Sequence, residues 1–89
     1  MKRNASVPEI EEIEAVGCAV QNLYLSATAY GLGGYFSTGG ATYIDEAKSF
    51  LGLNEEDKLL GFFYLGYVQT PSTAGKRQPV AEKIIWVRE

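Results

Sequence analysis

The sequence of 89 residues contains no histidine and only one cysteine. Without histidine, the commonest general base and the commonest metal ligand of proteins are both missing. The single cysteine, Cys18, cannot form a disulfide within the chain, and scattered carboxylates do not complete a metal-binding set around it. We therefore expect no metal site, a buried structural thiol at Cys18, and a reducing, cytoplasmic location.

The chain also lacks a basic cluster and a long uninterrupted apolar run. Eight Lys and Arg residues against eleven Asp and Glu residues give a net charge of -3, which leaves no electrostatic footprint for nucleic acid. The longest apolar segment is interrupted by four polar residues, Gln21, Asn22, Ser26 and Thr28. It therefore falls short of the roughly 20 apolar residues that a membrane span requires. No apolar signal region follows the basic residues at 1–4. We expect neither nucleic acid nor membrane as a partner.

Apolar residues recur at intervals of three and four over about residues 7–30, which predicts one long helix. Ser6 and Glu9 have the spacing of a capping box at its start, and Gly31 suits the residue that ends it. From Val16 onward the helix is apolar nearly all round, as buried helices are. We expect its second half to be buried.

The remaining sequence predicts shorter elements. The glycine-rich residues 33–40 indicate a loop, and residues 45 to about 51 indicate a short helix that ends at the following glycine. The continuous apolar run 59–68 predicts a strand buried on both faces. Residues 69–80 are typical of a linker, and we expect a tail strand at 83–87 after it.

These elements predict an α+β fold that is incomplete. Two strands are too few for an independently stable sheet. A monomer of 89 residues buries only about 60 to 65% of the surface that its unfolded chain exposes, and the long helix and the apolar strand lack cover. We therefore expect residues 1–89 to form a single partial domain that is completed by dimerisation or by a higher oligomer.

Two features have the composition of a ligand site. The loop from Tyr35 to Gly39 combines aromatic, hydroxyl and glycine residues, which suit a planar polar ligand, and the pair Lys76 and Arg77 suits a phosphate. A plain surface loop and a solvated basic pair explain the same residues without any ligand. Residues alone leave both interpretations open.

Four segments, in this order and spacing, resemble the C-terminal half of the nitroreductase family of FMN enzymes. The segments are Ala15–Leu23, Tyr30–Gly34, Leu51–Leu53 and Gly61–Tyr67. The match covers about residues 14–68, and Arg77, Pro79, Glu82 and Trp86 are similar to the family's C-terminal tail. The resemblance implies a homodimer whose long buried central helices pack at the interface and whose tails cross to the other subunit.

The resemblance also implies an oxidoreductase that transfers electrons from NAD(P)H, through FMN, to nitro compounds, quinones or related small-molecule acceptors. In such enzymes the flavin carries the chemistry, so we assign no catalytic side chain. The implied cofactor contacts lie on one loop and on the tail: Phe36, Ser37, Thr38 and Gly39 for the flavin, and Lys76 and Arg77 for its phosphate.

A second hypothesis comes from a different functional class. The family's N-terminal half has no counterpart in these residues, and Ser37 stands where relatives often carry arginine. On this hypothesis the chain is a truncated, flavin-free scaffold that dimerises and has no enzymatic activity. FMN binding separates the two hypotheses.

Overall fold

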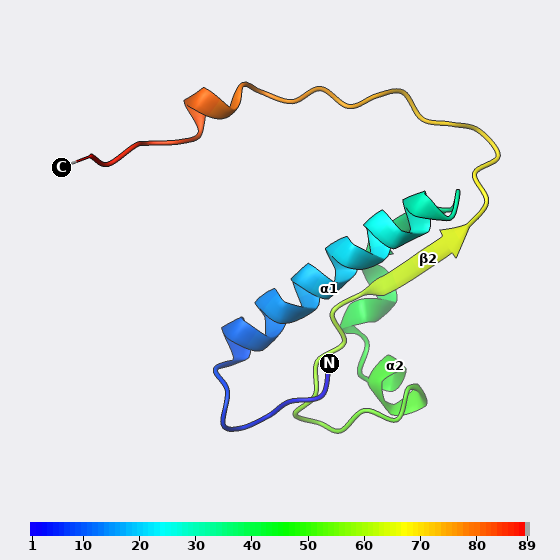
Figure 1. Cartoon of the computed structure of the whole chain (residues 1–89). Coiled ribbons are helices and arrows are strands. Elements are labelled where there is room, and N and C mark those ends of the chain that lie inside the picture. Colours follow the sequence, from blue (N-terminus) through cyan, green and yellow to red (C-terminus); the bar gives the residue numbers. More distant parts are fainter. Residues whose placement is uncertain (89) are drawn as a thin grey trace.

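The computed structural model describes residues 1–88, and Figure 1 shows a long helix lying along a small sheet, with an extended tail. The elements in chain order are α1 (Glu9–Ala29), β1 (Gly33–Ser37), the 3-10 turn η1 (Gly40–Tyr43), α2 (Asp45–Phe50), β2 (Phe62–Gly66) and the 3-10 turn η2 (Val80–Glu82). The predicted α+β class is confirmed, as are the long helix and the short one.

The end of α1 follows the prediction. Gly31 has a φ of +73°, in the left-handed region that favours glycine. The Leu32 N–H donates to the Ala27 carbonyl at 2.8 Å, and the Gly31 N–H donates to the Thr28 carbonyl at 3.0 Å. These two bonds form a Schellman motif, which ends the helix and turns the chain directly into β1.

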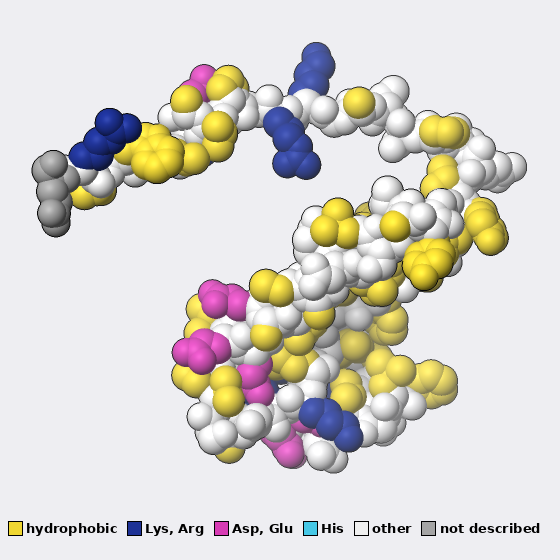
Figure 2. All heavy atoms as spheres, in the orientation of Figure 1, with side chains coloured by type: hydrophobic (Ala, Val, Ile, Leu, Met, Phe, Trp, Pro, Cys, Tyr) yellow, Lys and Arg dark blue, Asp and Glu magenta, His cyan; other side chains and the backbone are white. Residues whose placement is uncertain are grey.

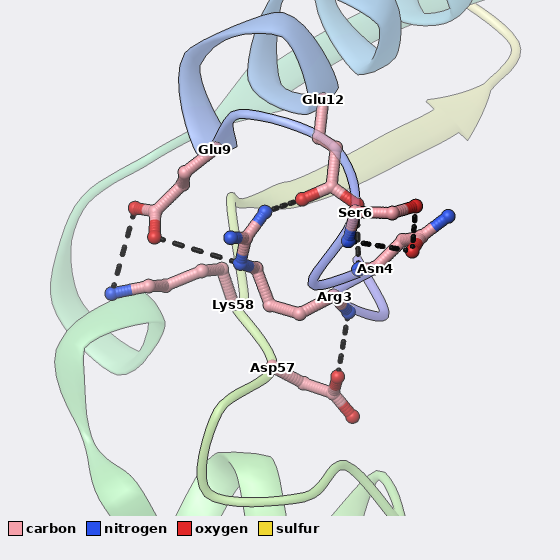
Figure 3. A network of polar contacts seen from close by, with 7 residues as sticks. All are labelled: Arg3, Asn4, Ser6, Glu9, Glu12, Asp57 and Lys58. Carbon is pink, nitrogen blue, oxygen red and sulfur yellow. Dashed lines mark hydrogen bonds and ion pairs between the residues drawn. The ribbon is translucent and has the colours of Figure 1, made fainter.

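The predicted capping box at the start of α1 is wrong. Pro8 is the N-cap residue, and no side chain caps the helix. The Ser6 hydroxyl donates to Asn4 Oδ1 at 2.7 Å, while the Glu9 carboxylate lies 3.6 Å from Arg3 Nε and 3.7 Å from Lys58 Nζ. The Ser6 hydroxyl is therefore bonded within a local turn and the Glu9 carboxylate faces two cations, so neither group caps the helix (Figure 3).

The N-terminal segment is held against the loop that precedes β2. The Met1 ammonium donates to the Lys58 carbonyl at 2.7 Å, and Arg3 forms an ion pair with Glu12 on α1. The Arg3 N–H donates to Asp57 Oδ1 at 2.8 Å (Figure 3). The Asn54 N–H donates to Asp57 Oδ2 at 2.9 Å. These two bonds, of which the Arg3 bond is the larger cause, lower the pKa of the Asp57 carboxyl below its usual range.

The sheet is an antiparallel pair in which Gly33 faces Gly66 and Ser37 faces Phe62. The prediction of a loop over residues 33–40 is therefore wrong for β1, because pairing with a distant strand overrides the local preference of glycine for turns. The apolar run 59–68 does contain β2, but Tyr64 and Leu65, which point to opposite faces, are 61% and 54% exposed. Burial of this strand on both faces is also wrong.

Little of the chain is fully buried. Among the described residues only Ala27, Thr42 and Asp57 are buried. One stripe of α1 is partly covered and consists of Glu12, Val16, Val20, Tyr24 and Ala27. The prediction of a buried second half is wrong for the single chain, since Cys18 is exposed and Leu25 is 60% exposed. A sheet of two strands covers only one side of this helix.

The tail leaves the sheet after β2 and carries hydrophobic and basic side chains at its surface (Figures 1 and 2). Residues 69–79 form no helix or strand in the structure, and the strand expected at 83–87 is absent from the described residues. Residues 67–88 are all exposed, and the sheet formed by the described residues contains only β1 and β2, so the tail pairs with no strand there. In the described range, no helix meets the length and hydropathy that a membrane crossing requires.

Candidate functional site

The expected flavin loop begins inside β1. Phe36 and Ser37 are the last two residues of the strand, and Thr38 and Gly39 connect it to η1. The end of the strand is fixed from two sides, by pairing with β2 and by the Phe36 N–H, which donates to the Tyr24 hydroxyl at 2.7 Å. The loop is therefore positioned by both α1 and the sheet.

An open hollow of about 420 Å³ lies beside this loop. Its lining residues come from the end of β1, the start of η1 and one face of β2: Ser37, Gly39, Gly40, Ala41, Phe62 and Tyr64. Phe62 and Tyr64 line it together because alternate residues of a strand share a face. A Cβ added at Gly39 or Gly40 meets no heavy atom within 4 Å, so the backbone there is open to a ligand.

Two of the four predicted loop residues line the hollow, and two do not. Ser37 and Gly39 are among the lining residues, whereas Phe36 and Thr38 are not. The Phe36 ring lies next to Gly61, since a Cβ added at Gly61 would be 2.7 Å from it. Thr38 is exposed beyond the strand end.

The structure does not bring the predicted phosphate residues to the loop. Lys76 and Arg77 lie on the extended tail, where both are exposed, and neither has an ion pair or side-chain hydrogen bond within residues 1–88. None of the lining residues is basic. Within one chain, the two residues expected to bind a phosphate therefore do not lie beside the hollow.

Sequence reasoning missed three aromatic residues that build the site. Phe62 and Tyr64 form the wall contributed by β2, and Tyr24 holds the loop from α1. Alternate residues of a strand share a face, which places Phe62 and Tyr64 together. The sequence does not reveal this pair, because every residue from Phe62 to Leu65 is aromatic or aliphatic and the two faces look alike. Nothing local in the sequence distinguishes Tyr24 from its neighbours on the helix.

The donor set of the hollow fits the ring system of a flavin. A flavin ring presents a planar aromatic body with polar edges, and the hollow offers the Ser37 hydroxyl, open backbone at Gly39 and Gly40, and two aromatic side chains. Within residues 1–88 no group of three or more Cys, Asp or Glu residues is arranged to hold a metal ion. The hollow is therefore a candidate cradle for a planar polar ligand on an α+β fold.

Comparison with known proteins identifies the family. The model of the nitroreductase family matches residues 1–67, and this chain belongs to that family. It is 33% identical over 78 residues to "Putative NAD(P)H nitroreductase YdjA" of Escherichia coli K12, and equally to the protein of that name in E. coli O157:H7. The crystal structure of the nitroreductase-like family protein from Bacillus cereus superposes with a TM-score of 0.69 at 28% identity.

The chain spans less than half the length of these relatives. The alignments cover 88% of the chain but 43% of each E. coli protein, and 76% of the chain but 36% of the B. cereus protein. The part that the family model matches, residues 1–67, includes α1, both strands and the loop between β1 and η1. The tail with Lys76 and Arg77 lies beyond that model.

Proposed function

We propose that this chain contributes the flavin-ring cradle of an FMN-dependent oxidoreductase. Family membership carries the proposal, together with the hollow that Ser37, Gly39 and the β2 aromatics line. When bound, FMN would supply the redox chemistry that transfers electrons from NAD(P)H to nitro compounds, quinones or related acceptors. The side chains bind and orient the flavin.

Four of the lining residues have a role in this proposal. The Ser37 hydroxyl and the open backbone near Gly39 hydrogen-bond the polar edge of the ring. Phe62 and Tyr64 pack against its aromatic body and exclude water from one side. Phe36 and Thr38 frame the loop, while Lys76 and Arg77 bind the phosphate when a tail is brought to the hollow.

The large exposed surface supports an oligomer as the functional unit. The chain exposes 7923 Å², whereas a compact monomer of this mass exposes about 5,100 Å². Two such chains together have an excess of about 5,600 Å², which is at the upper end of the total area that obligate interfaces bury. We propose a homodimer or higher oligomer in which the outer face of α1 is covered and residues 69–80 act as a linker that carries the tail to a neighbouring subunit.

The flavin-free scaffold remains the second candidate. Its support is the separation of Lys76 and Arg77 from the hollow within one chain. On this alternative, the chain keeps the apolar helix as an association surface and contributes no activity. For both candidates the exposed single thiol favours a reducing cytoplasm.

Flavin titrations test the proposal. FMN and riboflavin, which lacks the phosphate, are added to the purified 89-residue chain, and binding is followed by quenching of flavin fluorescence. We expect FMN to bind at least about 100-fold more tightly than riboflavin, because two charge-assisted contacts to the phosphate each contribute about 1.5–3 kcal/mol. The double variant Lys76→Gln/Arg77→Gln should remove most of that difference and leave riboflavin binding unchanged.

A matched control replaces Lys2 and Lys83 by Gln, which removes the same charge from positions outside the proposed contacts. This control should bind both flavins as the wild type does. A colourless chain that binds neither flavin at millimolar concentration, even with the remaining part of a relative supplied as a separate fragment, would overturn the flavin proposal and favour the scaffold.

A further inference from the structure

Tyr24 of α1 contacts both strands at one position along the sheet. Its hydroxyl accepts the Phe36 N–H at 2.7 Å. Its ring packs edge-on against Phe63, with the ring centroids 4.8 Å apart and the planes at 70°. Phe63 is the residue that faces Phe36 in the register, so one helical side chain fixes both members of the same cross-strand pair.

The Phe36 N–H lies on the open edge of β1. In an antiparallel pair, alternate residues direct their amide groups away from the partner strand. The amide of Phe36 bonds to Tyr24 rather than to β2, and within residues 1–88 the sheet has no third strand on that edge. Loss of the phenol oxygen would leave this half-buried amide with water as its only partner.

This anchor lies at the end of β1 that enters the hollow. The Schellman turn fixes the other end of the strand, next to Gly33. Ser37 directly follows the anchored amide and is itself a lining residue of the hollow, as is Gly39 two positions later. A displacement of the backbone at Phe36 therefore moves the groups that we assign to the flavin edge.

We infer that Tyr24 is a positioning residue for the flavin-contacting segment 36–39, and that its hydroxyl sets the affinity of that segment for the flavin ring. The ligand in this inference rests on the proposed function. The anchoring contact does not, because it is made within the chain.

The test is Tyr24→Phe, which removes the oxygen and keeps the ring against Phe63. Hydrogen exchange of the Phe36 amide is followed by NMR, and FMN and riboflavin are titrated by fluorescence. We expect exchange of this amide to accelerate at least 5-fold. We also expect Kd for both flavins to rise by an equal factor of about 2 to 12, the value of one hydrogen bond, because the anchor acts on the ring site and not on the phosphate.

Tyr30→Phe is the matched control, since it removes the same hydroxyl from a residue of the same helix end that is 83% exposed. It should change neither measurement. Equal losses of flavin affinity in the two variants, or unchanged exchange of the Phe36 amide in Tyr24→Phe, would overturn the inference.

The amide measurement also separates this inference from the proposed function. A wild-type chain that binds neither flavin overturns the proposed function and the ligand half of the inference, while exchange still decides whether Tyr24 anchors the strand. If Tyr24→Phe does not fold, the wild type alone decides: exchange of Phe36 as fast as that of an exposed amide contradicts the anchor, and protection supports it.

Discussion

At the scale of single residues, close approach of backbones explains the glycine that precedes β2. A Cβ added at Gly61 would be 2.6 Å from the Ser37 carbonyl oxygen and 2.7 Å from the Phe36 ring. The obstacle is partly backbone, which cannot rotate away as a side chain does. The absence of a side chain at Gly61 therefore permits the close approach of Ser37, which lines the hollow.

We predict that Gly61→Ala destabilises the chain by about 1–3 kcal/mol, the usual cost of overpacking. The measurement is urea unfolding followed by circular dichroism. Gly17→Ala is the control, because a Cβ at Gly17 meets nothing within 4 Å and alanine is favoured over glycine inside a helix by about 0.8–1 kcal/mol. Destabilisation by both substitutions alike would contradict the close-contact explanation.

At the scale of elements, the N-terminal segment and the loop before β2 are joined through Asp57. This carboxylate is only 2% exposed and accepts backbone N–H groups from Arg3 and Asn54. Because these bonds favour the ionised form, they lower the pKa of Asp57 in the folded chain, with the Arg3 bond as the largest cause.

This lowered pKa predicts a pH dependence of stability. Above the unfolded pKa of about 3.9, ionised Asp57 stabilises the fold, and this contribution is lost as pH falls through the lower folded pKa. Asp57→Asn should therefore unfold more easily than wild type at pH 7, and the gap between them should shrink as the pH falls below about 4. Thermal midpoints from pH 2 to 7 measure this, with Glu56→Gln, an exposed change in the same loop, keeping the wild-type profile.

Elements also show what the sequence can and cannot predict. The period of α1 and the left-handed glycine at its end are local signals, and the structure confirms both. The local sequence does not predict β1, because Gly33 and Gly34 disfavour a strand. Pairing with Gly66 and Leu65 stabilises it in the folded chain. The hollow cannot be predicted from the sequence for the same reason, since only the strand register places Tyr64 on the same face as Ser37. The tail strand expected at 83–87 has no partner strand within the described chain.

At the scale of the whole molecule, the chain is too extended for a self-sufficient domain. Its radius of gyration is 17.3 Å, against about 12 Å for a compact chain of this length. The face of α1 opposite the covered stripe presents Leu25 and Cys18, both exposed. Water does not stabilise such an apolar helical face, and nothing within residues 1–88 covers it.

The last prediction tests this surface directly. Leu25→Lys places a charge at the centre of the exposed apolar face, and burying an unpaired charge costs far more than an interface gains from one leucine. We expect sedimentation velocity at micromolar concentration to show an oligomer for wild type and mainly monomer for the variant. Glu14→Gln changes the net charge by the same amount on the same side of α1, in its polar half, and should leave the oligomer intact. A wild type that sediments as a monomer would contradict the proposed assembly, and dissociation of both variants would assign the effect to net charge rather than to the apolar face.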